Sequence, residues 1–216
     1  LVAGIALFGD VRASYESGQF NSPIRLYSAR VLNDENKFDD EKLIINQIRD
    51  AITAFRREPY NCCIFNLSLG DESVIVSEGG RQTRWAEALD TLARELGVLL
   101  IVAAGNRTDL QTFRADEAER ILVQYPQYLL ERASGLTDPS TAAIALTVGA
   151  IAGSDVPALR NGVGAEDILR PIAPAHAPAP FTRAGPGLNN AIKPEFVAPG
   201  GNLFFSGVGG ARVITY

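Results

Sequence analysis

An asparagine that directly follows a strand-like run is the residue of this chain best suited to chemistry. The run, Val98–Ala103, is almost wholly large and aliphatic, and Ala104, Gly105 and Asn106 come directly after it. A continuous apolar run without alternation is typical of a strand covered on both faces of a parallel sheet. Ligands bind at the carboxyl ends of such strands, where a fixed, neutral amide can donate a hydrogen bond to an oxyanion. Gly-Asn is equally ordinary in turns, so this stretch alone leaves both interpretations open.

Two other residues invite a catalytic interpretation but lack the partners that it needs. His176 is the single histidine of the chain and lies in the proline-rich stretch PIAPAHAPAP, which is not expected to hold a base rigidly. We expect it to be an exposed loop histidine. Ser68 has no accompanying histidine in the sequence pattern, so we do not expect it to act as a nucleophile.

The only two cysteines, Cys62 and Cys63, are adjacent and lie within a strand-like run. Neighbouring residues on a strand point to opposite faces, so a disulfide between the two would be strained. We therefore expect buried, reduced thiols, which fit a reducing compartment and favour the cytoplasm over secretion.

Composition and charge exclude several classes of function. The chain has 216 residues, a net charge of −5 and a pI of about 5.0. Lysines and arginines are scattered without a basic stripe, so we expect no nucleic-acid partner. No apolar run approaches the length that crosses a bilayer, so we expect no membrane partner. One histidine and two cysteines are too few for a metal site built from these ligands, and we expect no metal and no cofactor.

Hydrophobic periodicity predicts an α/β fold in a single domain over residues 1–216. Helices are predicted for Leu1–Phe8, Asp39–Arg57, Arg81–Leu96 and, with a break or kink at Pro126, Ala115–Ala133. Strands are predicted for Ile24–Leu32, Cys62–Leu69, Val98–Ala103, Ala143–Ile151, Ile192–Pro199 and Ala211–Tyr216. Gly153–Pro180, rich in Gly, Pro and Ala, is expected to be a long surface excursion. Strands that alternate with helices over short joints predict a mostly parallel sheet.

Several motifs, in their order and spacing, resemble those of the subtilisin-like serine peptidases (subtilases). They are FNLSLG at Phe65–Gly70, VLLIVAAGN at Val98–Asn106, DPSTAAIALTVGA at Asp138–Ala150, FTRAGP at Phe181–Pro186 and IKPEFVAPG at Ile192–Gly200. The chain departs from the family pattern at Thr182, where serine is typical, and at Glu195, where aspartate is typical. The resemblance implies a three-layer α/β/α fold whose mostly parallel, subtilisin-like sheet is incomplete at both ends.

The resemblance also implies roles for individual residues. Asn106 would be the side-chain donor of the oxyanion hole, and the partner would be a peptide or protein substrate. Ser68, Leu69 and Gly70 would form one wall of the substrate channel, where their main chain would pair with the peptide. The opposite wall would be formed by Ala103, Ala104 and Gly105, with Thr137 and Pro139 near the pocket floor. Plain packing is the competing interpretation for each of these wall and floor residues.

In subtilases, a segment like Val2–Ile5 follows directly on the His-Gly-Thr that carries the catalytic base. The nucleophile lies in a Gly-Thr-Ser motif shortly after a strand like Arg212–Tyr216. We therefore expect these residues to be the central segment of a serine endopeptidase domain that lies between the catalytic His and Ser motifs. The segment itself would be inactive, because the Ser-His-Asp triad lies outside it. The alternative is a non-catalytic pseudo-peptidase or peptide-binding module of the same fold.

Two further expectations follow from the resemblance. Missing helices would uncover apolar surface, so we expect self-association, such as a dimer. Many subtilases bind calcium, and Asp34, Glu35 and residues 39–41 form an acidic cluster. Its spacing matches no EF-hand loop, so a solvated turn with a charged helix start explains the cluster better than a calcium site.

Overall fold

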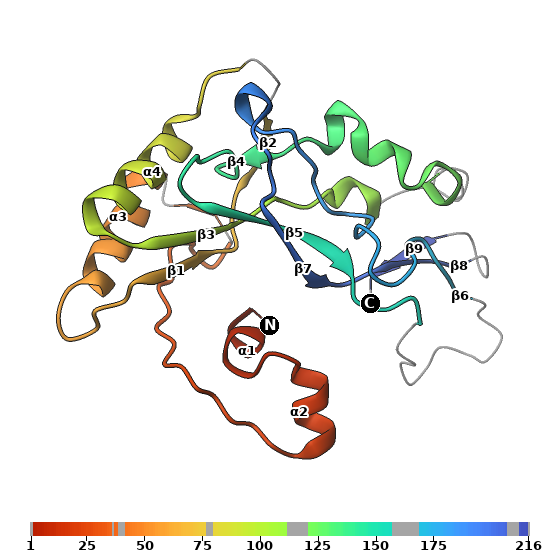
Figure 1. The fold of residues 1–216 in the computed structure, drawn as a ribbon, viewed down its shortest axis with the longest axis horizontal. Coiled ribbons are helices and arrows are strands. Elements are labelled where there is room, and N and C mark those ends of the chain that lie inside the picture. The colour runs from red at the N-terminus through yellow and green to blue at the C-terminus, as the bar shows by residue number, and fades with distance from the viewer. Residues whose placement is uncertain are drawn as a thin grey trace. The chain divides into compact units, whose positions relative to one another are not determined.

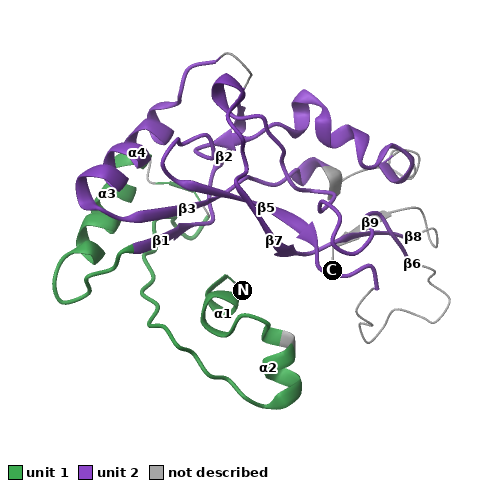
Figure 2. Ribbon diagram, viewed as in Figure 1, with its two compact units in different colours: residues 1–63 green, residues 64–216 purple. Residues whose placement is uncertain are grey.

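A computed structural model describes residues 2–35, 37–38, 42–76, 80–111, 121–156, 169–206 and 212–215. The chain divides into two compact units, Leu1–Cys63 and Ile64–Tyr216 (Figure 2). The expectation of a single domain stays a prediction. None of the described helices is long and apolar enough to cross a membrane.

The described residues of the first unit form the helices α1 (Val2–Phe8), α2 (Val11–Ser17) and α3 (Ile44–Arg56). In α2 the side chain of Asp10 accepts a hydrogen bond from the Ala13 N–H at 2.9 Å, which caps the helix. The apolar stripe of α3 buries Ile48 and Ile52, as its helical period predicted. α3 begins at Ile44 rather than at Asp39, and residues 39–41 lie outside the described part of the chain.

The predicted strand Ile24–Leu32 is wrong. These residues form no strand, and the Ile24 and Leu26 side chains are 51% and 41% exposed. Tyr27 instead packs on Phe55 and Tyr60, with ring centroids 5.8 Å and 4.9 Å away. Alternation of apolar residues suits a strand, but a strand also needs a neighbour to complete its hydrogen bonds, and no described strand pairs with this segment.

A parallel sheet lies at the centre of the second unit (Figure 1). It has four strands in the order β1-β3-β5-β7, and every neighbouring pair runs parallel. The strands are β1 (Ile64–Leu67), β3 (Leu99–Ala103), β5 (Leu146–Ala152) and β7 (Phe196–Gly200). The predicted α/β class with a mostly parallel sheet is therefore confirmed.

Helix α4 (Arg84–Leu96) precedes β3 and contacts it. The Thr83 hydroxyl accepts a hydrogen bond from the Ala86 N–H at 3.2 Å, and Gly97 ends the helix in the left-handed conformation at φ 59°. Its inner face buries Trp85, Ala88, Leu89 and Leu92, as predicted from the sequence.

Shorter antiparallel elements complete this unit. β2 (Asp71–Ile75) pairs with β4 (Thr137–Asp138), and β8 (Leu203–Ser206) lies between β6 (Leu169–Pro171) and β9 (Arg212–Thr215). The sequence indicated only the last of these strands.

The structure corrects one predicted segment and confirms a break in another. The expected surface excursion Gly153–Pro180 is wrong for its described carboxyl-terminal part, because β6 lies within it and Ile172, Ala173 and Ala179 are at most 4% exposed. The expected break at Pro126 is confirmed: helical residues 121–124 stop before it, and two 3-10 turns, Gln127–Leu130 and Arg132–Ser134, follow. Residues 115–120 and 157–168 lie outside the described residues.

The cysteines are free, but the expected burial is wrong. Cys62 is half-buried and Cys63 is exposed. The structural reason is their place in the chain, because both precede β1 rather than lying within it, and β1 is the outermost strand of the described sheet.

An ion pair between the buried Lys193 and the partly exposed Glu195 joins the amino ends of β5 and β7. The Lys193 ammonium donates to the Ala145 carbonyl at 2.8 Å and to the Thr147 hydroxyl at 3.2 Å, and it lies 2.6 Å from a Glu195 carboxylate oxygen. The second Glu195 oxygen accepts the Thr147 N–H at 2.8 Å. Lys193 and Glu195 of the IKPEFVAPG motif therefore connect β5 and β7 just before the backbone pairing of these strands begins at Val148 and Phe196.

Replacing Lys193 by methionine leaves the Glu195 carboxylate without its cation. We expect the Lys193→Met variant of the full-length protein to lose about 3 kcal/mol of unfolding free energy at pH 7, the lower end for a broken buried pair because Glu195 is 28% exposed. Urea unfolding measures this loss. Lys37→Met is the matched control, because Lys37 and Glu35 pair on the surface and losing that pair costs at most about 1 kcal/mol. Equal losses in the two variants would contradict a structural role for the buried pair.

The same pair predicts a pH dependence of stability. Burial alone would raise the pKa of Glu195, but hydrogen bonds from Lys193 and the Thr147 N–H outweigh it, so the pKa lies below its ordinary value of 4.5. Because the folded pKa is lowered, this stabilisation is complete above the unfolded pKa and is lost as pH falls through the folded pKa. Between about pH 5 and pH 3 the wild type should lose unfolding free energy more steeply than Lys193→Met. Parallel profiles would overturn this expectation.

Candidate active site

The carboxyl ends of β1 and β3 lie side by side. Leu67 is in register with Val102, so Ser68–Gly70 and Ala103–Asn106 leave the sheet at the same edge. Strand β5 flanks the end of β3, because Ala103 pairs with Val148 and the Ala104 N–H donates to the Val148 carbonyl at 2.9 Å, and β5 then runs on to Ala152. Two of the predicted segments are thus brought together by the parallel register.

The third predicted segment, Thr137–Pro139, lies against both strand ends. A Cβ atom added to Gly70 would stand 2.8 Å from the Asp138 carbonyl oxygen and 3.8 Å from Pro139 Cδ. A Cβ added to Gly105 would overlap the Thr137 hydroxyl. Both glycines therefore permit a close approach that no other residue would allow.

The backbone around Asn106 is held, while its side chain is free to bind. Asn106 forms an isolated antiparallel bridge with Thr182, and the next N–H, from Arg107, donates to the Phe181 carbonyl at 2.8 Å. The Asn106 residue is exposed, and within the described part of the chain its amide makes no hydrogen bond. A fixed backbone with an unoccupied amide is what hydrogen bonding to an external oxygen requires.

Exposure divides the predicted site residues into three groups. Ser68, Gly70, Ala103 and Asn106 are exposed, Leu69 and Gly105 are half-buried, and Ala104, Thr137 and Pro139 are at most 2% exposed. The last three support the strand ends from behind, so a ligand at this edge would meet small residues and main chain.

Asp138 links the predicted pocket floor to helix α4. Its carboxyl group accepts a hydrogen bond from the Thr83 hydroxyl, the same group that caps α4. Burial raises the pKa of Asp138 and the nearby Asp71 raises it further, while the Thr83 hydrogen bond partly opposes this rise. The segment before Pro139 is thereby anchored to the start of α4.

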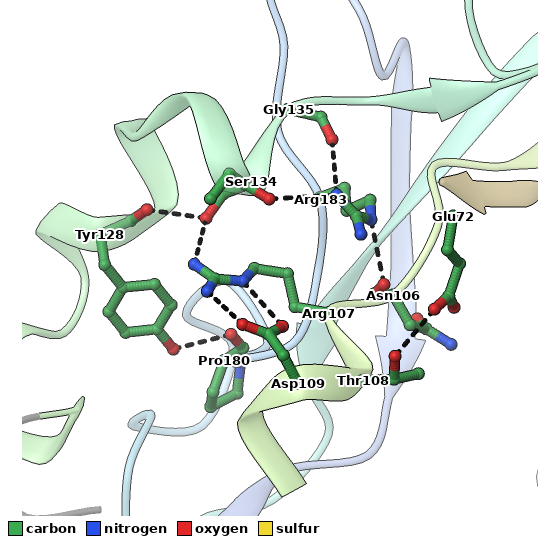
Figure 3. A network of polar contacts seen from close by, with 11 residues as sticks. Glu72, Asn106, Arg107, Thr108, Asp109, Tyr128, Ser134, Gly135, Pro180 and Arg183 are labelled. Atoms are coloured by element: carbon green, nitrogen blue, oxygen red, sulfur yellow. Dashed lines mark hydrogen bonds and ion pairs between the residues drawn. The ribbon is translucent and has the colours of Figure 1, made fainter. Parts of the chain in front are cut away.

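A polar network behind Asn106 was not predicted from the sequence (Figure 3). The Arg107 guanidinium donates to the Ser134 hydroxyl at 3.0 Å and binds both carboxylate oxygens of Asp109, at 2.6 Å and 3.2 Å. It also lies 5.7 Å from the centre of the Tyr128 ring. The hydrogen bond to Asp109 is the main reason why the pKa of Arg107 is raised, and the same bond lowers the pKa of Asp109. This bidentate pair fixes the residue that follows Asn106.

Arg183 belongs to the same network from the other side of Asn106 (Figure 3). It is only 6% exposed, and its Nε donates to the Asn106 carbonyl at 3.0 Å. Burial lowers the pKa of Arg183. The only signal in the sequence is an arginine inside the FTRAGP motif, between an apolar residue and small ones.

His176 and the acidic cluster are the other groups that the sequence singled out. His176 is exposed, as predicted, in a loop where its φ is 66°. Arg30 pairs with Asp34, and Lys37 pairs with Glu35, while residues 39–41 of the acidic cluster lie outside the described residues. Across the described ranges, no three His, Cys, Asp or Glu side chains gather as metal ligands would.

A hollow of about 470 Å³ lies at the opposite end of the sheet. Gln82, Lys193 and Glu195 are among its lining residues, so it opens near the amino ends of β5 and β7. Ligands of parallel sheets bind at the carboxyl ends. We therefore place the candidate site at the Asn106 edge rather than in this hollow.

Gly105→Ala is expected to displace the Asn106 loop. The added methyl would overlap the Thr137 hydroxyl and lie 2.8 Å from Arg183 Cδ, and Gly105 has a φ of +100°. We expect a loss of at least about 2 kcal/mol of unfolding free energy in urea titration of the full-length protein. Gly97→Ala is the control for φ alone, since its φ is +59° with nothing within 4 Å of the new Cβ. Gly97→Ala should lower the unfolding free energy by about 1 kcal/mol. A similar loss in Gly97→Ala and Gly105→Ala would argue against the close approach of Gly105 to Thr137 and Arg183.

Comparison with known proteins identifies the family of this chain. The model of the subtilase family matches residues 1–215. Uncharacterized protein y4bN of Sinorhizobium fredii (strain NBRC 101917 / NGR234) is 41% identical over 163 residues, which make up 76% of this chain and 36% of that protein. The chain thus spans little more than a third of that relative's length.

The chain also matches solved structures of proteases. The psychrophilic subtilisin-like protease Apa1 from the Antarctic psychrotroph Pseudoalteromonas sp. AS-11 is 18% identical at a TM-score of 0.44, covering 88% of this chain and 29% of that one. The prenylagaramide maturation protease PagA is 20% identical at a TM-score of 0.41, covering 92% of this chain and 53% of that one. Because the family model spans nearly the whole chain, the chain belongs to the subtilase family.

Proposed function

We propose that these residues form the central part of the catalytic domain of a serine endopeptidase. The full-length protein would hydrolyse peptide bonds with a Ser-His-Asp triad, and Asn106 would donate the side-chain hydrogen bond of the oxyanion hole. The observation that most directly supports this proposal is the exposed Asn106 amide, which makes no hydrogen bond within the described residues. The Asn106 backbone, at the end of β3, is held by its bridge to Thr182.

The chemistry of peptide hydrolysis explains why an amide suits this position. Attack on the scissile carbonyl places a negative charge on its oxygen, and a donor already aimed at that oxygen stabilises the charge without reorganising. Asn106 is neutral and cannot lose its N–H protons at ordinary pH, so it remains a donor throughout the reaction.

Membership of the subtilase family and the exposed strand ends support a peptide or protein as the substrate. Ser68 and Gly70 on one side and Ala103 on the other are exposed and small, which leaves their main chain open to an extended peptide. An added peptide strand would pair with such main chain, and Asn66 steadies the first wall by donating to the Ser68 hydroxyl at 2.8 Å.

We propose that the triad residues lie outside residues 1–216. A triad needs a histidine base, and the single histidine of this sequence is exposed in a loop. Its backbone N–H donates to the Ala152 carbonyl at 2.8 Å, and its ring makes no hydrogen bond within the described residues. The isolated segment would therefore lack the base and have no turnover.

Self-association stays a proposal. Phe196 and Val197 on β7 are 56% and 57% exposed, and these apolar side chains would supply part of such a contact.

Replacing Asn106 tests the proposed role directly. We expect Asn106→Ala in the full-length protein to lower kcat for a peptide substrate about 10²–10³-fold and to leave KM within about twofold, because the lost donor acts only in the transition state. Asn46→Ala, at an exposed position on α3, is the matched control and should leave kcat unchanged.

Three outcomes would contradict the proposal. Turnover by purified residues 1–216 that a serine-directed inhibitor abolishes would place a working triad inside the segment. An unchanged kcat in Asn106→Ala would remove the oxyanion role. Peptide binding by the full-length protein without any inhibitor-sensitive hydrolysis would favour a non-catalytic peptide-binding module instead.

A further inference from the structure

The side chain of Arg183 joins two separate segments of the candidate site (Figure 3). Its Nε donates to the Asn106 carbonyl at 3.0 Å, and its Nη1 donates to the Ala133 and Gly135 carbonyls at 3.1 Å and 3.0 Å. The acceptors lie 77, 50 and 48 residues away in the sequence, so this one side chain connects distant parts of the chain.

Arg183 also packs against the residue before Asn106. A Cβ atom on Gly105 would stand 2.8 Å from Arg183 Cδ and 3.3 Å from its Nε. The Arg183 side chain therefore lies directly against the Gly105 backbone while it binds the Asn106 carbonyl. Rotation of the peptide that carries Asn106 would break this hydrogen bond and this contact together.

The second anchor comes from the residue after Asn106. Arg107 donates to the Ser134 hydroxyl, and Ser134 lies between the two other carbonyls that Arg183 binds. Both arginines thus hold the Asn106 loop to the same turn, Arg132–Ser134 and the residue after it. Asn106 is flanked on each side by a tether to one rigid element.

The arrangement of acceptors explains why this position is an arginine. The planar guanidinium donates to these three carbonyls through two differently directed nitrogens, Nε and Nη1. A lysine ammonium would reach only some of these carbonyls. Within the described residues no carboxylate forms an ion pair with Arg183, so its hydrogen bonds go to neutral carbonyls whose positions they fix.

We propose that Arg183 is a positioning residue of the oxyanion hole, which holds the Asn106 amide in its productive orientation through the Asn106 carbonyl. The inference rests on the proposed function for its catalytic consequence. Arg183 would touch neither the substrate nor the reacting atoms, so its whole effect on the reaction would pass through Asn106.

A double-mutant cycle in the full-length protein tests this dependence. We expect Arg183→Met to lower kcat about 10–100-fold with KM within twofold, because a small misplacement of a catalytic donor is costly. In the Asn106→Ala background the same substitution should change kcat less than about twofold. Arg183→Lys should recover part of the lost kcat, and Arg132→Met, the same change at an exposed arginine of the tethering turn, should leave kcat unchanged. Equal losses of kcat in both backgrounds, or no loss, would overturn the proposal.

Hydrogen exchange of the backbone separates this proposal from the proposed function. In Arg183→Met, or in Arg183→Lys if the first variant does not fold, exchange at residues 104–107 should rise about tenfold or more while α4 stays protected. This rise in exchange would support the positioning role of Arg183 even if the wild type hydrolyses no peptide. A wild type without peptide hydrolysis would contradict only the proposed function. Unchanged exchange at residues 104–107, or an equal rise in α4, would overturn the tether.

Discussion

The parallel register of β1 against β3 decides where the candidate site residues lie. With Leu67 opposite Val102, the two strands end together, so Ser68–Gly70 and Ala103–Asn106 emerge at one edge. A slip of one residue would turn each side chain to the other face of the sheet and separate these ends. β5 repeats the register through Ala103 and Val148, so the wall segments inherit their spacing from the backbone ladder.

Small residues allow close packing at this common edge of the sheet. At Gly70 and Gly105 the absence of a side chain lets Thr137–Pro139 lie directly behind both strand ends. Asp138 then connects this segment to α4 through Thr83, the residue that also caps that helix. At the opposite end of the sheet, Lys193 and Glu195 connect the residues at the starts of β5 and β7.

How far the sequence predicts this structure depends on how local each feature is. Val98–Ala103 was recognisable as a strand of a parallel sheet from its continuous apolar run, and the motif order predicted which segments meet. The expectation that both faces of this strand are covered is wrong, because Leu100 and Val102 are buried whereas Leu99 and Ala103 are exposed. Ile24–Leu32 alternates as a strand does, yet pairing depends on a neighbour that no local pattern reveals. The role of Arg183 was hidden for the same reason. A loop arginine is ordinarily solvated, and its acceptors at Asn106, Ala133 and Gly135 lie 48 to 77 residues away.

The proposed chemistry requires the arginines beside Asn106 and the Asn106 amide to have different roles. A cation at the donor position itself would bind any carboxylate, including the product acid, as well as the transition state. Here the charge of Arg107 is offset by Asp109, and the hydrogen bonds of Arg183 go to main-chain carbonyls behind the loop. In the proposed mechanism the two arginines would hold the loop from behind, and the neutral amide alone would face the reacting oxygen. Rigid placement of a weak donor favours the transition state over the ground state, because the donor gains most when full charge appears in front of it.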